Sequence, residues 1–154
     1  MTRLSDTTAI NAPAVAVWEA IRSPADHADW HPFVTSIEGG HDLGDVRRCT
    51  AEVDGKSGTT RETCTVLDEG TAIAWRIDED SLGFSRMVSD WNAGFTVEPT
   101  DDGTTVTAWS EFQPRRWWVR LMLPMIARKF HGTQRAILDG LRTHAAAGGA
   151  PAAS

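Results

Sequence analysis

Glu62 is the residue whose type and setting point most directly to chemistry. It lies in residues 59–67, which read as a β-strand whose alternate side chains are Thr60, Glu62, Cys64 and Val66. Because the last two are apolar, we expect this face to turn inward and Glu62 to lie on a cavity wall. A carboxyl group there loses solvation, which raises its pKa toward the range useful for a general acid or base. The alternatives are an ion pair with Arg48, Arg76 or another basic group, or exposure through a different register.

His31 is the second candidate for proton transfer. It lies within the run Trp30-His31-Pro32, where the proline disfavours helical geometry in the residue before it and should end a short helix. We expect this corner near the cavity mouth, where a histidine could move a proton close to neutral pH. The alternative is a surface or capping histidine.

The expected ligand-binding wall combines aromatic, aliphatic and neutral polar side chains. Among the seven tryptophans we expect Trp18 and Trp75 in the core. Trp109 is a candidate for the cavity wall, but it lies on the strand face opposite Val106 and Ala108, so the alternative is that it points outward. Flat aromatic faces suit a flat or long apolar ligand, and hydroxyl or amide groups could orient its carbonyl. The residues expected to bind ligand are Trp30, Trp91, Ser89, Ser110, Met122, Ile126, Phe130 and Gln134.

No motif in the sequence indicates a metal or a nucleotide cofactor. The chain contains no C-x-x-C motif, no cluster of Cys and His residues and no glycine-rich phosphate loop, so we expect neither a cofactor nor a metal site. The two cysteines, Cys49 and Cys64, could face each other across a hairpin and form a disulfide, or could be buried thiols. Residues 1–8 are polar, so we expect no targeting segment and a cytoplasmic protein.

Charge is distributed unevenly along the 154 residues. The net charge is −6, but the segment from Pro114 onward holds seven Arg or Lys residues and one acidic residue, whereas residues 1–113 hold eight basic and twenty acidic residues. The acidic body argues against nucleic-acid binding. The basic C-terminal segment is either a solvated helix face or a contact for a membrane surface or an acidic carrier protein. That contact would involve Arg115, Arg116 and Arg120.

The elements that must position these residues are mostly short strands. We expect a first strand at 4–10, helices at 14–22 and 25–30, and then six strands separated by turns rich in Gly and Asp. The six expected strands are 34–38, 44–53, 59–67, 71–77, 87–97 and 104–112. Short connections imply antiparallel pairing, and residues 78–85 are expected to form a loop.

A long amphipathic helix is expected to close the chain. From about Pro124 onward, apolar residues recur at spacings of four and seven, with basic residues on the other side. Such a helix needs an apolar partner of similar length, so we predict an α+β fold in which a curved antiparallel sheet of about seven strands holds it. We expect one domain over 1–146 and a flexible tail over 147–154.

Several stretches carry a family resemblance. They are Ile10-Asn11-Ala12-Pro13 with Val17-Trp18, Trp30-His31-Pro32, Gly44–Arg48, Asp54-Gly55, Arg61-Glu62, Gly103–Thr107 and the final helix. The chain resembles the superfamily of START domains, the birch pollen allergen and polyketide cyclases, known as SRPBCC, and in particular its polyketide cyclase/dehydrase-like branch. The resemblance implies a helix-grip fold. The aromatase/cyclase members are expected to use cavity tyrosines, and this chain contains none.

The functional hypothesis follows from the expected hollow between sheet and helix. It should bind a hydrophobic, aromatic or polyketide-like small molecule, and Glu62 could act as the acid or base in cyclisation or dehydration. Holding a flexible chain in one conformation would supply much of such catalysis. The alternatives are a non-catalytic carrier of lipids or other hydrophobes and a protein-interaction module using the basic helix; a dimer is one possible oligomeric state.

Overall fold

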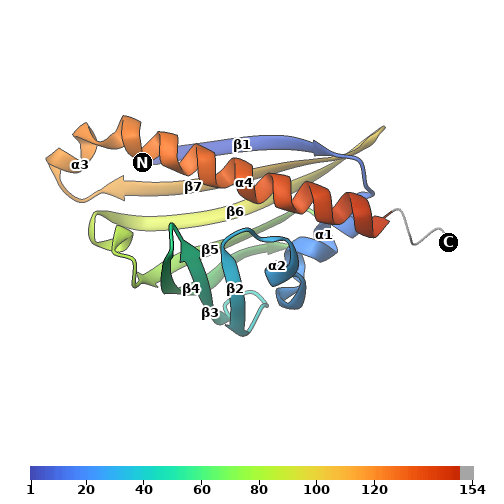
Figure 1. Ribbon diagram of the computed structural model, residues 1–154, viewed down its shortest axis with the longest axis horizontal. Helices are drawn as coiled ribbons and strands as arrows, with labels where there is room; N and C mark the ends of the chain where they lie inside the picture. Colours follow the sequence, from blue (N-terminus) through green and yellow to red (C-terminus); the bar gives the residue numbers. More distant parts are fainter. Residues whose placement is uncertain (150–154) are drawn as a thin grey trace.

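A single antiparallel sheet wrapped around one long helix makes up the computed structural model, which describes residues 1–149 (Figure 1). The strands are β1 (Thr2–Ile10), β2 (Val34–Gly39), β3 (Val46–Val53), β4 (Lys56–Asp68), β5 (Ala72–Asp80), β6 (Val88–Thr100) and β7 (Gly103–Pro114). The helices are α1 (Ala14–Arg22), α2 (Pro24–Trp30), the 3-10 helix η1 (Phe84–Arg86), α3 (Trp117–Leu121) and α4 (Leu123–Gly149). The seven strands follow the order β1-β7-β6-β5-β4-β3-β2. This confirms the predicted helix-grip fold with two short helices after the first strand.

Strand lengths differ from the prediction where turns are tighter than expected. Asp54 and Gly55 both have positive φ angles, 52° and 78°, so they form the whole connection and β4 begins at Lys56. β5 continues to Asp80, three residues into the predicted loop. The carboxylate of Asp80 accepts hydrogen bonds from the backbone N–H groups of Leu82 (2.9 Å) and Phe84 (2.7 Å), which fixes the turn after the strand.

α4 crosses the inner face of the sheet and divides the core into two clusters (Figure 1). Near its start, Ile126 and Phe130 pack with Phe112. Toward its end, Leu138 and Leu141 pack with a larger cluster that includes residues of α1. The helix begins one residue before Pro124, as expected, and continues to Gly149. Residues 147–149 of the predicted tail are therefore helical, and residues 150–154 lie outside the described residues.

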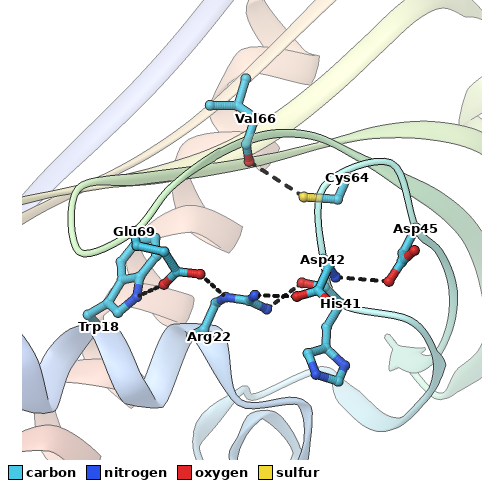
Figure 2. Close-up of polar contacts among 8 residues, drawn as sticks. All are labelled: Trp18, Arg22, His41, Asp42, Asp45, Cys64, Val66 and Glu69. Carbon is cyan, nitrogen blue, oxygen red and sulfur yellow. Dashed lines mark hydrogen bonds and ion pairs between the residues drawn. The ribbon is translucent and has the colours of Figure 1, made fainter.

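The end of α1 is fixed by a polar cluster around Arg22 (Figure 2). Arg22 donates to the carboxylates of Glu69 (3.1 Å) and Asp42 (2.7 Å) and also to the backbone oxygen of His41. The indole of Trp18 donates to the other oxygen of Glu69 at 2.9 Å. One arginine therefore connects α1 to two loops of the sheet. These contacts attach the end of α1 to the β2–β3 and β4–β5 connections.

Cys49 and Cys64 are both buried free thiols. In the sheet register Cys49 faces Thr60, whereas Cys64 faces Trp75, so the two side chains are not cross-strand partners. The thiol of Cys64 instead donates to the backbone oxygen of Val66 at 3.5 Å, as Figure 2 shows. Of the two alternatives for these cysteines, the structure has the buried thiols. Within residues 1–149, no helix combines the length and apolar composition needed to cross a membrane.

Candidate functional site

A cavity of about 150 Å³ lies between the sheet and α4. Along α4 its wall is formed by Gln134 and by Ile137, which also packs against the larger core cluster. Most of the lining is apolar, and the charged and imidazole groups come from α2, the residue that follows it, β3 and β4. The remaining lining residues are His27, His31, Val34, Arg47, Cys49, Glu62, Trp75, Ile77, Ala93, Gly94, Phe95, Ala108, Trp109 and Ser110.

Glu62 lies on the cavity wall, where it forms an ion pair with Arg47. The two are direct partners in the β3–β4 register, and Arg47 donates to Glu62 Oε1 from Nε (3.0 Å) and Nη2 (2.7 Å). The hydroxyl of Thr60 donates to Oε2 at 2.7 Å, and the thiol of Cys49 lies 3.7 Å from Oε1. Both carboxylate oxygens therefore accept hydrogen bonds. The ion-pair alternative is realised with Arg47, a partner that the sequence did not single out.

Arg47 is itself held between Glu62 and Trp75. Its side chain is only 9% exposed, and its guanidinium carbon lies 3.8 Å from the ring centroid of Trp75. A guanidinium in this position gains from the ring's negative face as well as from the carboxylate. The cavity thus contains a buried cation that is paired but still forms part of the wall. An arginine fixed in this way can attract a carbonyl or hydroxyl oxygen of a ligand without moving.

His27 and His31 are neutral and have complementary tautomers. His31 Nδ1 accepts hydrogen bonds from the backbone N–H groups of Phe33 and Val34, both at 3.1 Å, so its proton is on Nε2. His27 Nδ1 lies 3.2 Å from the backbone oxygen of Ser23 and must donate to it, which leaves Nε2 as an acceptor. Both rings line the cavity. The pair therefore offers one donor and one acceptor to a ligand.

Burial keeps both imidazoles uncharged. It lowers the pKa of His27 to about 4, with a further contribution from the positive charge of Arg47. It lowers the pKa of His31 to about 3, with contributions from His27 and Arg47. A group with this pKa does not change protonation near neutral pH, so the structure does not support the expectation that His31 shuttles a proton there. His31 can instead donate a hydrogen bond from Nε2.

The thiol of Cys49 is unreactive in this environment. Burial and the nearby carboxylate of Glu62 raise its pKa to about 12. A thiolate nucleophile is therefore not available at neutral pH. Among residues 1–149, no three His, Cys, Asp or Glu side chains gather in a way that could hold a metal ion.

A chain of hydrogen bonds leads from the cavity wall to the edge of the sheet. Ser110 donates to Gln134 Oε1 at 2.9 Å, and Gln134 Nε2 donates to Asp6 at 2.8 Å. Asp6 also accepts from His131 (2.7 Å) and Arg135 (3.2 Å). Burial opposes ionisation of Asp6, but the bonds from His131 and Gln134 outweigh it and lower its pKa. This network fixes the orientation of Ser110 and Gln134, two residues expected to bind ligand.

Four of the ten predicted site residues line the cavity, namely Glu62, His31, Ser110 and Gln134. Trp30 does not, because it is buried in the larger cluster, where its indole donates to the backbone oxygen of Ala20 at 2.9 Å. The others expected at the wall but found in the second cluster are Trp91, Met122, Ile126 and Phe130. Their rings and side chains pack against one another and fill that end of the space between sheet and helix.

Ser89 points away from the cavity because of an irregularity in β6. The register with β7 shifts between Ser89 and Asn92, and Asp90 has a φ of 51°. A bulge adds one residue, which reverses the alternation of faces on its two sides. Val88 is buried in the second cluster, so its neighbour Ser89 faces outward and contacts Asp90 at 3.5 Å. The regular alternation assumed from the sequence is wrong at this point.

Trp109 lies on the outer face of the sheet, the direction that its strand position favoured. The guanidinium carbon of Arg3 is 4.4 Å from its ring centroid. Its indole edge lies beside its register partner Gly94, where a Cβ would come too close, and both residues are part of the cavity lining.

Sequence reasoning missed two polar residues of the site, and each had a signal. Arg47 is two residues before Cys49, so it shares the strand face that was expected to be apolar. His27 is four residues before His31, the spacing that places side chains on one face of a helix. A basic residue on an apolar face next to an inward Glu62 would have indicated their pairing.

The fold and the lined cavity define a helix-grip protein. The chain belongs to the family described as polyketide cyclase/dehydrase and lipid transport, whose model matches residues 1–146. This family confirms the resemblance drawn from the sequence. The comparison with curated proteins gives no match.

Solved structures with the same fold come from plants and bacteria. The chain is similar to major latex-like protein 151 from Panax ginseng, with a TM-score of 0.77, 13% identity, and coverage of 93% of this chain and 96% of the other. It is similar to a START superfamily protein from Mycobacterium smegmatis, with a TM-score of 0.76, 14% identity, and coverage of 93% and 96%. For the Zhui aromatase/cyclase from Streptomyces sp. R1128 the values are 0.73, 20%, 94% and 93%. At these identities the likeness concerns the fold.

Proposed function

We propose that this protein binds a small hydrophobic molecule, an aromatic or polyketide-like ring with one polar edge, in the cavity between the sheet and α4. The observation that carries the proposal is the distribution of groups on the wall. Apolar residues such as Phe95, Ala108 and Ile137 form most of it, while Arg47 and the two histidines gather on one side. An apolar pocket with a few fixed polar groups is the usual form of a small-molecule site.

The volume limits the size of the ligand. Ligand pockets typically measure about 300–1,000 Å³, whereas an engineered apolar cavity of about 150 Å³ binds benzene. The present cavity of about 150 Å³ therefore suits one ring with a small substituent. A longer ligand requires the neighbouring cluster of Phe84, Trp91 and Phe130 to move, since these side chains fill the adjoining space.

The polar side selects the kind of substituent. His31 offers a donor at Nε2, His27 offers an acceptor at Nε2, and Arg47 adds positive charge. A phenolic or enolic hydroxyl beside a carbonyl can both donate and accept, so it satisfies the two imidazoles together. An all-apolar ligand would leave these groups without partners in a dry site, which costs binding energy.

A thermal-shift screen tests the binding. The panel contains single-ring phenols and hydroxy-ketones, fused-ring polyketide-like compounds, fatty acids and sterols. A ligand at 100 times its Kd adds about 2.7 kcal/mol, or roughly 5–10 °C for a chain of this size. We expect this shift with single-ring hydroxy-carbonyl compounds.

Ala108→Leu, which fills the cavity, should abolish the shift, and Ala28→Leu on the exposed side of α2 should keep it. Equal shifts in the two variants would contradict binding in this cavity.

Catalysis is the second candidate function, with Glu62 as the acid or base in ring closure or dehydration. Its position on the cavity wall and the cyclase/dehydrase description of the family support it. Glu62→Gln is the variant of choice, because the amide can still accept from Arg47 and donate to Thr60. We expect retained ligand shifts and lost turnover. Turnover by Glu62→Gln at the rate of the unchanged protein would exclude Glu62 as the acid or base, and absence of turnover by the unchanged protein with every substrate would indicate a non-catalytic carrier.

A further inference from the structure

A stripe of large apolar side chains is exposed where α3 leads into α4. Trp117 and Leu121 are each 73% exposed, Met125 is 61% exposed, and Trp118 is 40% exposed. Trp117, Leu121 and Met125 follow one another at spacings of four. Because the connecting residue Met122 has helical backbone geometry, these three side chains lie on one side of a helical segment. Single exposed apolar residues are common, but a contiguous group of this size marks an interaction site.

Positive charge surrounds this stripe. Residues 112–138 contain six Arg or Lys residues and no Asp or Glu. Lys129 and Arg135 pair with carboxylates, whereas Arg116, Arg120 and Arg128 form no ion pair with any residue of the described part. Three cations near exposed tryptophans on the surface of an otherwise acidic protein indicate an anionic partner.

The stripe is presented by an anchored element. Val119 of α3 is fully buried and packs with Phe112 in the second cluster. Arg115 donates from its backbone N–H to Met87 (2.9 Å) and from Nε to the backbone oxygen of Val88 (2.7 Å). The apolar side chains are therefore exposed on a helix that is itself fixed to β6. Arg115 serves this attachment rather than the surface.

We propose that this α3 surface, consisting of Trp117, Trp118, Leu121, Met125, Arg116, Arg120 and Arg128, docks on an anionic lipid bilayer. Tryptophan rings favour the headgroup region, and arginines gain from the negative surface potential. A bilayer accepts apolar and cationic groups side by side without a shape of its own. An acidic protein offers no equally general place for the exposed rings. Figure 1 shows α3 at the end of the molecule away from the C-terminal end of α4, so nothing described blocks this approach.

Vesicle flotation tests the proposal. The experiment needs no ligand in the cavity, so its result is independent of the proposed small-molecule binding. The vesicles contain either phosphatidylcholine alone or equal parts of phosphatidylcholine and phosphatidylglycerol. We expect binding only to the second kind and a decrease with added salt. Arg116→Glu/Arg120→Glu should weaken it at least about thirtyfold, since each basic residue contributes about a fivefold gain near such a surface. Trp117→Ser/Leu121→Ser should weaken binding at low salt as well, because it removes buried apolar area.

Matched controls separate this surface from net charge and apolar content. Arg48→Glu/Arg61→Glu changes the net charge equally, and Val15→Ser/Leu43→Ser removes two other exposed apolar residues. Both should bind as the unchanged protein does. Failure of the unchanged protein to bind anionic vesicles would overturn the proposal, as would equal losses in the control variants. The unchanged protein could instead form a dimer that the Trp117→Ser/Leu121→Ser variant dissociates, and fail to bind vesicles. This result would show that a second copy of the chain covers the α3 surface, and it would also overturn the proposal.

Discussion

Arg47 and Glu62 are direct register partners on β3 and β4, and both nitrogens that Arg47 directs at Glu62 donate to the same carboxylate oxygen. The side chains are 9% and 13% exposed, so each charge depends on the other for most of its stabilisation. The pair fixes the polar side of the cavity, because Trp75 and Thr60 hold its two ends. The contribution of the ion pair to stability and the cost of leaving one of its charges unpaired can be measured separately.

Removing one charge of the Arg47–Glu62 ion pair should destabilise the protein more than removing both charges. Arg47→Met leaves the carboxylate of Glu62 buried with only Thr60 and a thiol near it, and we expect a loss of about 3–5 kcal/mol in the free energy of unfolding. Arg47→Met/Glu62→Gln removes both charges and should recover much of this loss. Urea unfolding of the two variants checks the order. A double variant less stable than the single one would show that the ion pair is not the cause.

Stability should fall as the pH drops below 6.5. His27 and His31 have folded pKa values of about 4 and about 3, below the usual 6.5, so the unfolded chain binds more protons in this window. As the pH falls below 6.5, each histidine lowers the free energy of unfolding by about 1.4 kcal/mol per pH unit, or by about 2 kcal/mol at pH 5. This loss continues until the pH reaches the folded pKa of that histidine. The carboxylate of Asp6, whose pKa is lowered, adds its loss only at lower pH.

Urea unfolding at pH 7 and pH 5 measures this slope. His27→Asn/His31→Asn is the matched variant, because an asparagine can place an amide group where each Nδ1 lies and keep the backbone hydrogen bonds. Its stability should depend much less on pH between 5 and 6.5. An unchanged slope would mean that other groups carry the dependence.

Two glycines of α4 should respond in opposite directions to the same change. A Cβ at Gly140 would overlap the backbone oxygen of Trp30, whereas one at Gly132 would meet nothing within 4 Å. We therefore expect Gly140→Ala to lower the free energy of unfolding by about 1–3 kcal/mol. Gly132→Ala should raise it by about 1 kcal/mol through helix propensity. Thermal unfolding of the two variants decides, and a stabilised Gly140→Ala would contradict the close packing of α4 on α2.

The hydrogen-bond chain at the cavity wall should be sensitive to loss of its middle member. Gln134→Leu leaves Ser110 and Asp6 each without one partner in a buried setting, and we expect a loss of about 1–3 kcal/mol. Arg135→Leu removes an exposed partner of the same carboxylate and should cost less than about 1 kcal/mol. Chemical unfolding of the two variants compares their losses of stability. Equal losses would show that burial of the hydrogen-bond network adds nothing to stability.

The fold could be predicted from the sequence to within a few residues at most element ends. Alternating side chains, Gly-Asp turns and the four-residue spacing after Pro124 are local signals, and each is present in the structure apart from the break in alternation near Asp90. The face of Glu62 was also predictable, because it follows from strand periodicity alone. The expected wall of Trp91, Met122 and Phe130 was not, since inward-facing residues can either line a space or fill it.

The sequence by itself determined the strands, the helices α1, α2 and α4, their order and most of the inward strand faces, because these depend on neighbours a few residues away. The short helices η1 and α3 were not among the predicted elements. Only the tertiary structure decided that Arg47 pairs with Glu62, which requires the register of two strands. It also decided that the bulge at Asp90 turns Ser89 outward and that the cavity is confined to the region of Gln134 and Ile137. These features depend on how side chains from distant segments share a limited volume, and packing of that kind has no local signal.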